Sequence, residues 1–312
     1  MSTLLNHPLV SVVIATYNGE RFLAEQLESI LNQTYSNIEI IAVDDCSTDN
    51  TVAILKEYAA ADSRIKVVVN DANIGYVKNF EKGLKLASGD YIAPSDQDDI
   101  WKKEKIEVLV KEMNGHEIVY SNSELIDSNG QSLHKKLSDI KRLLSFDDCL
   151  TYAIGNTAAG HAMILTREVA NRSYPFPTMI PHDYWLGFVA TCRQPIRFVD
   201  IPLVLYRQHA ANVFGAVKVA EGKRKKVKPT KAKKLLQIRE RMRLLYEKCP
   251  ANLVMQKQVY RDLVDSYQDF SLSNNLKRMM IFFKHRDKIL AFKNKPAFRK
   301  WLFCFKMFYK IK

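Results

Sequence analysis

At residues 91–101 the sequence reads YIAPSDQDDIW, which places three carboxylates within four positions directly after a short apolar run. Carboxylates this close repel one another and are costly to bury, so a hard divalent cation with a phosphate on its far side would stabilise them. A D-x-D triplet on its own is more often a solvated acidic turn. The rest of the sequence has to decide between a metal site and a turn.

Segments typical of strands and helices alternate on both sides of this stretch. The predicted strands are residues 9–16, 38–43, 65–69, 91–93 and 118–120, and the predicted helices between them are 22–31, 51–61, 76–87 and 102–114. This alternation predicts an α/β fold with a mostly parallel central sheet that is flanked by helices on both faces.

Polar residues stand at the ends of three of these strands: Tyr17, then Asp44 and Asp45, then residues 96–99. Ligands of such sheets bind at the carboxyl ends of the strands, so these groups should line one crevice. Each also has a plainer interpretation, because Tyr17 suits a turn and Asp44-Asp45 suits a helix N-terminus. Their coincidence at three strand ends favours a shared site.

The alternation loosens after Asn122. Here we predict a helix at 143–154, a strand at 158–165, a helix at 182–192 and a last strand at 196–206. We expect this half to cap the crevice and hold a second substrate. Asp99, on the alternate side of an extended chain, is expected to cap a helix that starts near Trp101.

The net charge of +13 is concentrated in the last third of the chain. Residues 222–234 form a cationic segment that is too charged to pack on itself. Residues 298–312 place Arg299, Lys306 and Lys310 on one helical stripe, with aromatic and aliphatic side chains around the rest. That composition suits a helix lying on an anionic membrane, and equally a C-terminal helix packed on the protein's own core.

The five cysteines are scattered, odd in number and never spaced as C-x-x-C. This favours ordinary reduced thiols over a disulfide framework or a zinc site. The N-terminus lacks a signal-peptide pattern, and no apolar run approaches the roughly 20 residues that span a bilayer. We therefore expect a cytoplasmic protein.

A nucleoside diphosphate would use the residues of the predicted crevice well. Asp96 and Asp98 could bind the ribose, a metal-bound water or the metal itself, which would bridge the diphosphate. Tyr17 offers a ring for base stacking or ribose contact. Asp45 can accept a hydrogen bond from the imide N–H of uracil or thymine.

Four motifs in order, VSVVIATYNG at 10–19, VDDCSTD at 43–49, NIG at 73–75 and GDYIAPSDQDDIW at 89–101, closely resemble the family 2 glycosyltransferases with the nucleotide-diphospho-sugar transferase (GT-A) fold. The resemblance covers about residues 8–215. It implies metal-dependent, inverting transfer of a sugar from a nucleotide donor to an acceptor hydroxyl, with a divalent metal, Mn²⁺ or Mg²⁺, as cofactor.

The resemblance also assigns roles to individual residues. It implies that Tyr17 and Asp45 contact the nucleoside and that Lys78 approaches the nucleotide sugar. Asp96 and Asp98 match the D-x-D pair, with Asp96 contacting both donor and metal. Asp183, in the segment HDYW, matches the acidic residue that serves as general base.

Residues 205–215, LYRQHAANVFG, resemble the closing motif of bacterial rhamnosyltransferases that build O-antigen and cell-wall polysaccharides. His209 there looks like a third metal ligand or a diphosphate contact, and an imidazole beside two carboxylates slightly favours Mn²⁺ over Mg²⁺. The chain lacks the Q-x-x-R-W segment of processive synthases, which favours transfer of one or a few residues over long polymerisation.

Together these features predict a catalytic domain at residues 1–215, with a nucleotide-sugar half at about 1–122 and an acceptor half at about 123–215. A basic helical region follows at 216–312. The expected donor is dTDP-rhamnose, with a UDP-linked hexose or N-acetylhexosamine as the alternative. The expected acceptor is a polyprenyl-diphosphate-linked saccharide, which the basic tail would meet at the inner face of the cell membrane.

Two other classes of protein fit the sequence less well. A nucleotidyltransferase usually opens with a glycine-rich loop and a basic residue, whereas ATYNG at 15–19 has one glycine and no cation before Arg21. A non-enzymatic polyanion-binding protein could use the lysine-rich segment. That segment has no interleaved aromatic residues, and the mildly acidic first two thirds of the chain would repel nucleic acid, so no nucleic-acid partner is expected.

Overall fold

The computed structural model describes residues 7–209, 230–293 and 295–310. Four parallel strands form the first part of its sheet, in the spatial order β3-β2-β1-β4: β1 (Val10–Thr16), β2 (Ile38–Asp44), β3 (Ile65–Val69) and β4 (Tyr91–Ser95). Thr16 pairs with Asp44, and Ile14 pairs with Ser95. The strands therefore end along one edge, as the alternation of the sequence predicts.

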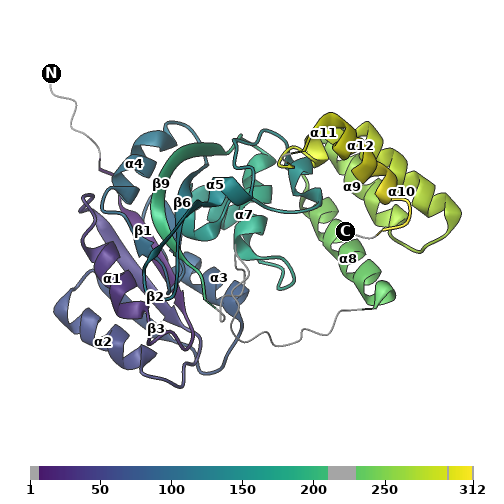
Figure 1. The fold of residues 1–312 in the computed structure, drawn as a ribbon. Coiled ribbons are helices and arrows are strands. Elements are labelled where there is room, and N and C mark those ends of the chain that lie inside the picture. The colour runs from purple at the N-terminus through teal and green to yellow at the C-terminus, as the bar shows by residue number, and fades with distance from the viewer. Residues whose placement is uncertain (1–6, 210–229, 294, 311–312) are drawn as a thin grey trace.

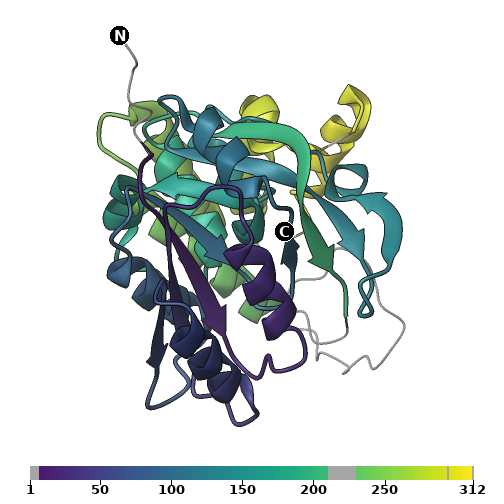
Figure 2. The ribbon, with the colours of Figure 1, turned by 90° about the vertical axis from the view of Figure 1, so that its left-hand side faces the viewer.

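Beyond β4 the sheet becomes mixed. β8 (Met163–Thr166) lies antiparallel between β4 and β6 (Ile118–Ile126), and β6 pairs in parallel with the long, curved β9 (Arg197–Arg207). The short strands β5 (Ile100–Trp101) and β7 (Ser132–Lys136) pair antiparallel with β9 and β6 (Figures 1 and 2). The described residues thus form one nine-stranded sheet, of which the first four strands keep the parallel order.

Helices cover both faces of the parallel strands. Alternate residues of a strand point to opposite faces, and in β1 Val12 and Ile14 belong to the same apolar cluster as α1 (Leu23–Leu31), α2 (Thr51–Ala61) and α4 (Lys105–Met113). Val13 points the other way and packs with α3 (Tyr76–Leu86). The flanked sheet that the sequence predicts is therefore confirmed.

Between residues 137 and 191 the helices of the structure differ in part from those that the sequence predicts. The predicted helix at 143–154 is wrong, since only a 3₁₀ turn at Cys149–Ala153 forms there. Two short helices also form, α5 (Leu137–Ile140) and α6 (Arg167–Ser173). The helix predicted at 182–192 is confirmed as α7 (His182–Thr191).

Asp99 does not cap a helix near Trp101. Residues 100–101 belong to β5, and α4 begins only at Lys105, with Glu104 at its N-cap position. The sequence predicts a helix start a few residues too early. Trp101 is apolar like Ile106 of the helix, and both are buried in the structure. Asp99 is instead fully buried, and its Oδ1 accepts a hydrogen bond from the Arg207 N–H at 3.0 Å.

The C-terminal helices gather on one side of the sheet-containing part (Figure 1). They are α8 (Lys231–Lys248), α9 (Val254–Ser266), α10 (Leu272–Lys284), α11 (Arg286–Ile289) and α12 (Ala297–Lys306). Tyr260 of α9 packs against Phe188 of α7, with ring centroids 5.7 Å apart. Most of the predicted cationic segment at 222–234 lies outside the described residues. Among those described, no helix is long and apolar enough to cross a membrane.

Candidate functional site

A pocket of about 1010 Å³ opens at the carboxyl ends of the parallel strands. Its lining includes six of the seven residues that the sequence singled out: Tyr17, Asp45, Asp96, Asp98, Asp183 and His209. The remaining one, Lys78, instead forms an ion pair with Glu81 of the same helix, at 2.6 Å. The crevice predicted from the strand ends therefore exists, and residues from the second half of the chain close it.

Asp45 holds the loop that leads into α3. Its Oδ1 accepts hydrogen bonds from Asn70 Nδ2 (2.9 Å) and from the Ile74 N–H (2.8 Å), and its Oδ2 accepts one from the Gly75 N–H (2.9 Å). Gly75 has a φ of 82°, a conformation that glycine adopts without steric cost. A carboxylate offers about four acceptor positions, so Asp45 keeps one for a ligand in the pocket.

Gln97, the middle residue of the D-x-D motif, fixes the loop that carries Tyr17. Its Oε1 accepts a hydrogen bond from the Tyr17 N–H (2.9 Å), and its Nε2 donates one to the Tyr17 carbonyl (3.1 Å). A Cβ on Gly19 would stand 2.3 Å from Gln97 Oε1, so this contact requires glycine there. The Tyr17 side chain remains about half exposed at the pocket, where a base could stack on it.

β9 brings His209 to the D-x-D motif. Its pairing with β5 aligns Leu205 with Ile100, and His209 Nε2 then lies 2.8 Å from Asp98 Oδ2. The buried Arg207 strengthens the junction, because its Nε donates to the Asp98 carbonyl (2.9 Å) and its guanidinium also pairs with Glu25 of α1. His209 is the last described residue of the rhamnosyltransferase-like motif, and residues 210–215 of that motif lie outside the described part.

A second group of possible metal ligands lies beside the first. Asp96, Asp99 and His161 each offer one ligand atom within 4.8 Å of the others. His161 Nδ1 lies 3.8 Å from Asp96 Oδ2 and 3.9 Å from Asp99 Oδ2, while Ser123 Oγ bonds its Nε2 at 3.0 Å. Burial lowers the pKa of His161 to about 3, so the ring is neutral near pH 7 and keeps a nitrogen lone pair.

A buried lysine lies beneath these acids. Lys105 Nζ donates to the His161 carbonyl (2.6 Å) and stands 3.1 Å from the centre of the Trp101 ring. Burial drives the pKa of Lys105 well below its ordinary value, although Asp99 and Asp96 oppose that shift. A single lysine side chain cannot balance the three carboxyl groups of Asp96, Asp98 and Asp99.

The acidic cluster fits a divalent cation. Desolvation, followed by the negative charges of Asp98 and Asp183, raises the pKa of Asp96 to about 7, and that of Asp99 also rises well above the usual range for a carboxyl group. Asp99 Oδ2 is buried and has no hydrogen-bond partner. Carboxylates and neutral imidazoles form a ligand set that suits Mg²⁺ or Mn²⁺, and a cation would relieve the repulsion among these acids.

Asp183, in the first turn of α7, also lines the pocket. Its Oδ1 accepts a hydrogen bond from the Tyr184 N–H at 2.7 Å, and Gly160 approaches so closely that a Cβ there would lie 3.3 Å from Asp183 Cβ. Desolvation raises the pKa of Asp183 to about 6. The carboxylate can therefore be charged near neutral pH and still accept a proton easily, which is what a general base needs.

Sequence reasoning missed several members of this site: Gln97, Asp99, Lys105, His161 and Arg207. His161 stands in an apolar stretch with no motif around it, so no local signal distinguishes it from a core histidine. Gln97 and Arg207 lie within recognised motifs, but only the tertiary structure shows that they fix a loop. Asp99 belongs to the acidic triplet and could have been predicted as a site residue, but the prediction that it caps a helix was wrong.

Comparison with known proteins gives consistent matches. The family model described as "Glycosyl transferase family 2" matches residues 11–172. The Escherichia coli UDP-Glc:alpha-D-GlcNAc-diphosphoundecaprenol beta-1,3-glucosyltransferase WfgD is 34% identical over 185 residues, which are 57% of this chain and 68% of the relative. The Shigella flexneri dTDP-rhamnosyl transferase RfbG is 33% identical over 221 residues, which are 65% of this chain and 74% of the relative.

The fold itself also has solved counterparts. The crystal structure of S. aureus TarS 1-349 in complex with UDP-GlcNAc superimposes with a TM-score of 0.58 at 19% sequence identity. The match covers 96% of this chain and 80% of the other. At this level of identity the likeness concerns the GT-A arrangement of sheet and helices.

Proposed function

The chain belongs to glycosyl transferase family 2, and from this premise we propose that it transfers a sugar, with inversion, from a nucleoside-diphosphate sugar to a hydroxyl of a saccharide acceptor. The observation that supports the proposal most directly is that the D-x-D carboxylates and Asp183 line the same pocket. A donor diphosphate and an acceptor hydroxyl can approach one another between them.

The donor nucleoside lies, in this proposal, over the ends of β1 and β2. Tyr17 stacks on the base, and Asp45 accepts the imide hydrogen bond with its remaining acceptor position. Gln97 holds the Tyr17 backbone in place. Lys78 would leave its ion pair with Glu81 to approach the nucleotide sugar.

In this proposal Asp96, Asp98 and His209 would hold a divalent cation, Mn²⁺ or Mg²⁺. When bound, that cation neutralises charge that develops on the leaving nucleoside diphosphate. Asp99 and His161, just beneath, supply further oxygen and nitrogen ligands or orient the first three. Arg207 holds the D-x-D motif next to His209 by donating a hydrogen bond to the Asp98 carbonyl.

Asp183 takes the proton from the acceptor hydroxyl as the new glycosidic bond forms. Inversion in one displacement requires a base on the acceptor side, opposite the leaving group. The raised pKa of Asp183, about 6, lets it accept the proton without being permanently protonated near pH 7.

For the donor we propose dTDP-rhamnose, with a UDP-linked hexose or N-acetylhexosamine as the alternative, in bacterial surface polysaccharide synthesis. RfbG is described as a dTDP-rhamnosyl transferase, and WfgD uses UDP-glucose. Asp45 meets the same imide in uracil and thymine, so the pocket residues named here support either nucleotide. WfgD is described as acting on a diphosphoundecaprenol-linked sugar, which supports a lipid-linked acceptor here as well.

A donor screen tests this proposal. Purified full-length protein with Mn²⁺ is mixed with each dTDP- or UDP-sugar and a synthetic GlcNAc-diphospho-lipid, and released nucleoside diphosphate is measured. We expect release with one donor class, and its loss in Asp98→Asn. Ile201→Ser, an exposed change on β9 outside the pocket lining, serves as the matched control. No release with any donor, or full activity of Asp98→Asn, would refute the assignment.

We further propose that residues 1–215 form the catalytic domain and that 216–312 form a region that rests on the inner face of the cell membrane. One face of α12 is buried in the protein through Phe303 and Cys304, whereas Trp301 and Phe305 are about half exposed. Those two rings pack with Phe283 of α10 into one aromatic surface. Aromatic rings among lysines suit the headgroup level of an anionic bilayer.

Vesicle sedimentation tests this surface. Binding of the protein to vesicles that contain phosphatidylglycerol should weaken in the double variant Trp301→Ser/Phe305→Ser, because the rings no longer insert. The exposed Ile201→Ser variant should bind as wild type does. Equal sedimentation of all three proteins would show that the aromatic surface does not contact lipid.

A further inference from the structure

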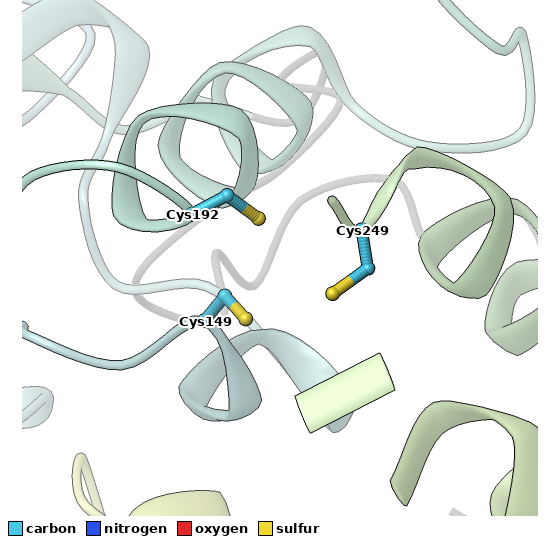
Figure 3. Close-up of side chains that lie close together, drawn as sticks. All are labelled: Cys149, Cys192 and Cys249. Carbon is cyan, nitrogen blue, oxygen red and sulfur yellow. The ribbon is translucent and has the colours of Figure 1, made fainter. Parts of the chain in front are cut away.

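Three cysteines that are far apart in sequence meet in the interior of the protein (Figure 3). Cys149 begins the 3₁₀ turn, Cys192 caps the C-terminus of α7, and Cys249 caps the C-terminus of α8. Their Sγ atoms all lie within 4.8 Å of one another, and the three side chains point toward a common centre. No local sequence pattern indicates this cluster, because no two of these cysteines have a metal-binding spacing.

The distances suit a shared metal ion better than a disulfide. Zn²⁺ binds thiolate sulfur at about 2.3 Å, so tetrahedral coordination separates the sulfur atoms by about 3.8 Å. The three sulfur atoms need to move together by no more than about 1 Å to reach that arrangement. A disulfide would require two of them to approach to about 2 Å and would leave the third without a role.

The backbone around the cluster is already fixed. The Cys149 carbonyl accepts a hydrogen bond from the Tyr260 hydroxyl at 2.7 Å, and the Cys249 carbonyl accepts one from Lys257 Nζ at 2.5 Å. The Cys192 N–H bonds the Phe188 carbonyl at 3.2 Å within α7. The three thiols are therefore presented by anchored backbone, so little ordering is needed when an ion binds.

Charges near the cluster favour anionic sulfur. Lys257 and Lys248 attract the charged forms of Cys249 and Cys192. Asp148 opposes this effect, but its carboxylate is engaged by Lys288 Nζ at 2.5 Å.

Burial distinguishes the three positions. Cys149 and Cys249 are almost completely buried, whereas Cys192 is partly exposed. Buried cysteines are often simple core residues. Cys304, which is buried on α12 and bonds the Phe282 carbonyl, is such a residue and provides an internal comparison.

We propose that Cys149, Cys192 and Cys249 bind one Zn²⁺ ion, with water in the fourth position. Binding releases thiol protons to solvent, so the affinity should fall at acidic pH. The ion would join α8, and with it the C-terminal helices, to α7. Because Asp183 stands at the other end of α7, the same ion would also steady the helix that presents the proposed base.

Metal analysis tests this site without any measurement of catalysis. Full-length protein, kept reduced with a phosphine, is loaded with Zn²⁺ and freed of excess ion. We expect about one zinc per chain, released by a mercurial that attacks thiolates and leaves carboxylate ligands intact. Cys192→Ser should lose most of the tightly bound zinc, whereas Cys304→Ser should retain it.

Co²⁺ provides a second measurement on wild-type protein, which matters if a cysteine variant fails to fold. Thiolate-bound tetrahedral Co²⁺ absorbs strongly in the visible and near ultraviolet, whereas Co²⁺ held by carboxylates and histidine lacks the sulfur charge-transfer band. Absence of that band would overturn the proposal, as would zinc content that is equal in wild type and Cys192→Ser. A native mass that shows a disulfide between two of these cysteines in the zinc-loaded protein would overturn it too.

Discussion

Replacing Asp183 with asparagine isolates the role of the carboxylate as a base. Asparagine has nearly the same shape, and its Oδ1 can still accept the hydrogen bond from the Tyr184 N–H, so α7 should begin as it does now. What the variant loses is the ability to accept a proton. General-base catalysis contributes about 10²- to 10⁴-fold, which corresponds to about 3–5 kcal/mol in the activation free energy.

The pKa of Asp183 sets the expected pH dependence. The carboxylate works as a base only when it is ionised, and burial raises its pKa to about 6. Activity should therefore be constant above about pH 7 and fall as the pH drops through 6. At pH 5 about a tenth of the molecules carry an ionised Asp183, so kcat/KM should be about tenfold lower than the plateau.

The assay measures nucleoside diphosphate release from the donor identified in the screen, at saturating Mn²⁺ so that Asp96 stays ionised throughout. Donor affinity is measured separately by calorimetry. We expect Asp183→Asn to bind donor as wild type does, to transfer at least a hundredfold more slowly, and to lose the acidic limb of the pH profile. An asparagine variant within about threefold of wild type, or one with an unchanged limb near pH 6, would refute the role as base.

Three further predictions concern the Tyr17 loop and the stability of the fold. Gln97→Ala removes two hydrogen bonds to the Tyr17 backbone, each of which contributes about 1 kcal/mol. Donor affinity, measured by calorimetry, should therefore fall about ten- to thirtyfold. An unchanged affinity would show that Gln97 does not position the Tyr17 loop. Glu39→Gln should lower the free energy of unfolding by about 2–3 kcal/mol at pH 7, because hydrogen bonds from Ser11, Ser88 and Lys66 hold the pKa of Glu39 at about 2, below its unfolded value. That difference should be complete above about pH 5 and shrink as the pH falls toward 2 in urea titrations, and a pH-independent difference would count against it. Gly83→Ala should destabilise the fold by about 1–3 kcal/mol despite better helix propensity, because the added Cβ would stand 2.4 Å from Val13 Cγ1; a higher Tm would contradict this packing argument.

The part of the site that could be predicted is the part that follows directly from strand order. Parallel neighbours place their carboxyl ends together, so Tyr17, Asp45 and Asp96 had to converge once the strands at their N-terminal sides were recognised. The fold class follows from the same alternation. Asp183 and His209 were reached only through the resemblance to a family, since nothing in their local sequence places them near the first three.

The sequence could not reveal the mixed half of the sheet, because pairing between distant strands leaves no local pattern. β9 pairs with both β6 and β5, and this closure carries Arg207 and His209 to the Asp98 end of the site. The failed helix at 143–154 has a related cause. Its apolar residues face several neighbours at once, including Tyr260 of α9, and tertiary packing overrides their helical spacing.

The pairing of β9 with β5 and β6 gives the three acids of residues 96–99 different surroundings. Asp98 faces His209, Asp96 faces the pocket and His161, and Asp99 turns inward, where its Oδ1 accepts a hydrogen bond from the Arg207 N–H. A purely solvated turn would not bury one of its acids completely or leave a buried oxygen such as Asp99 Oδ2 without a partner. A cation at this position would offset the cost of ionising Asp99 in the interior, which supports the proposed metal site over a plain acidic turn.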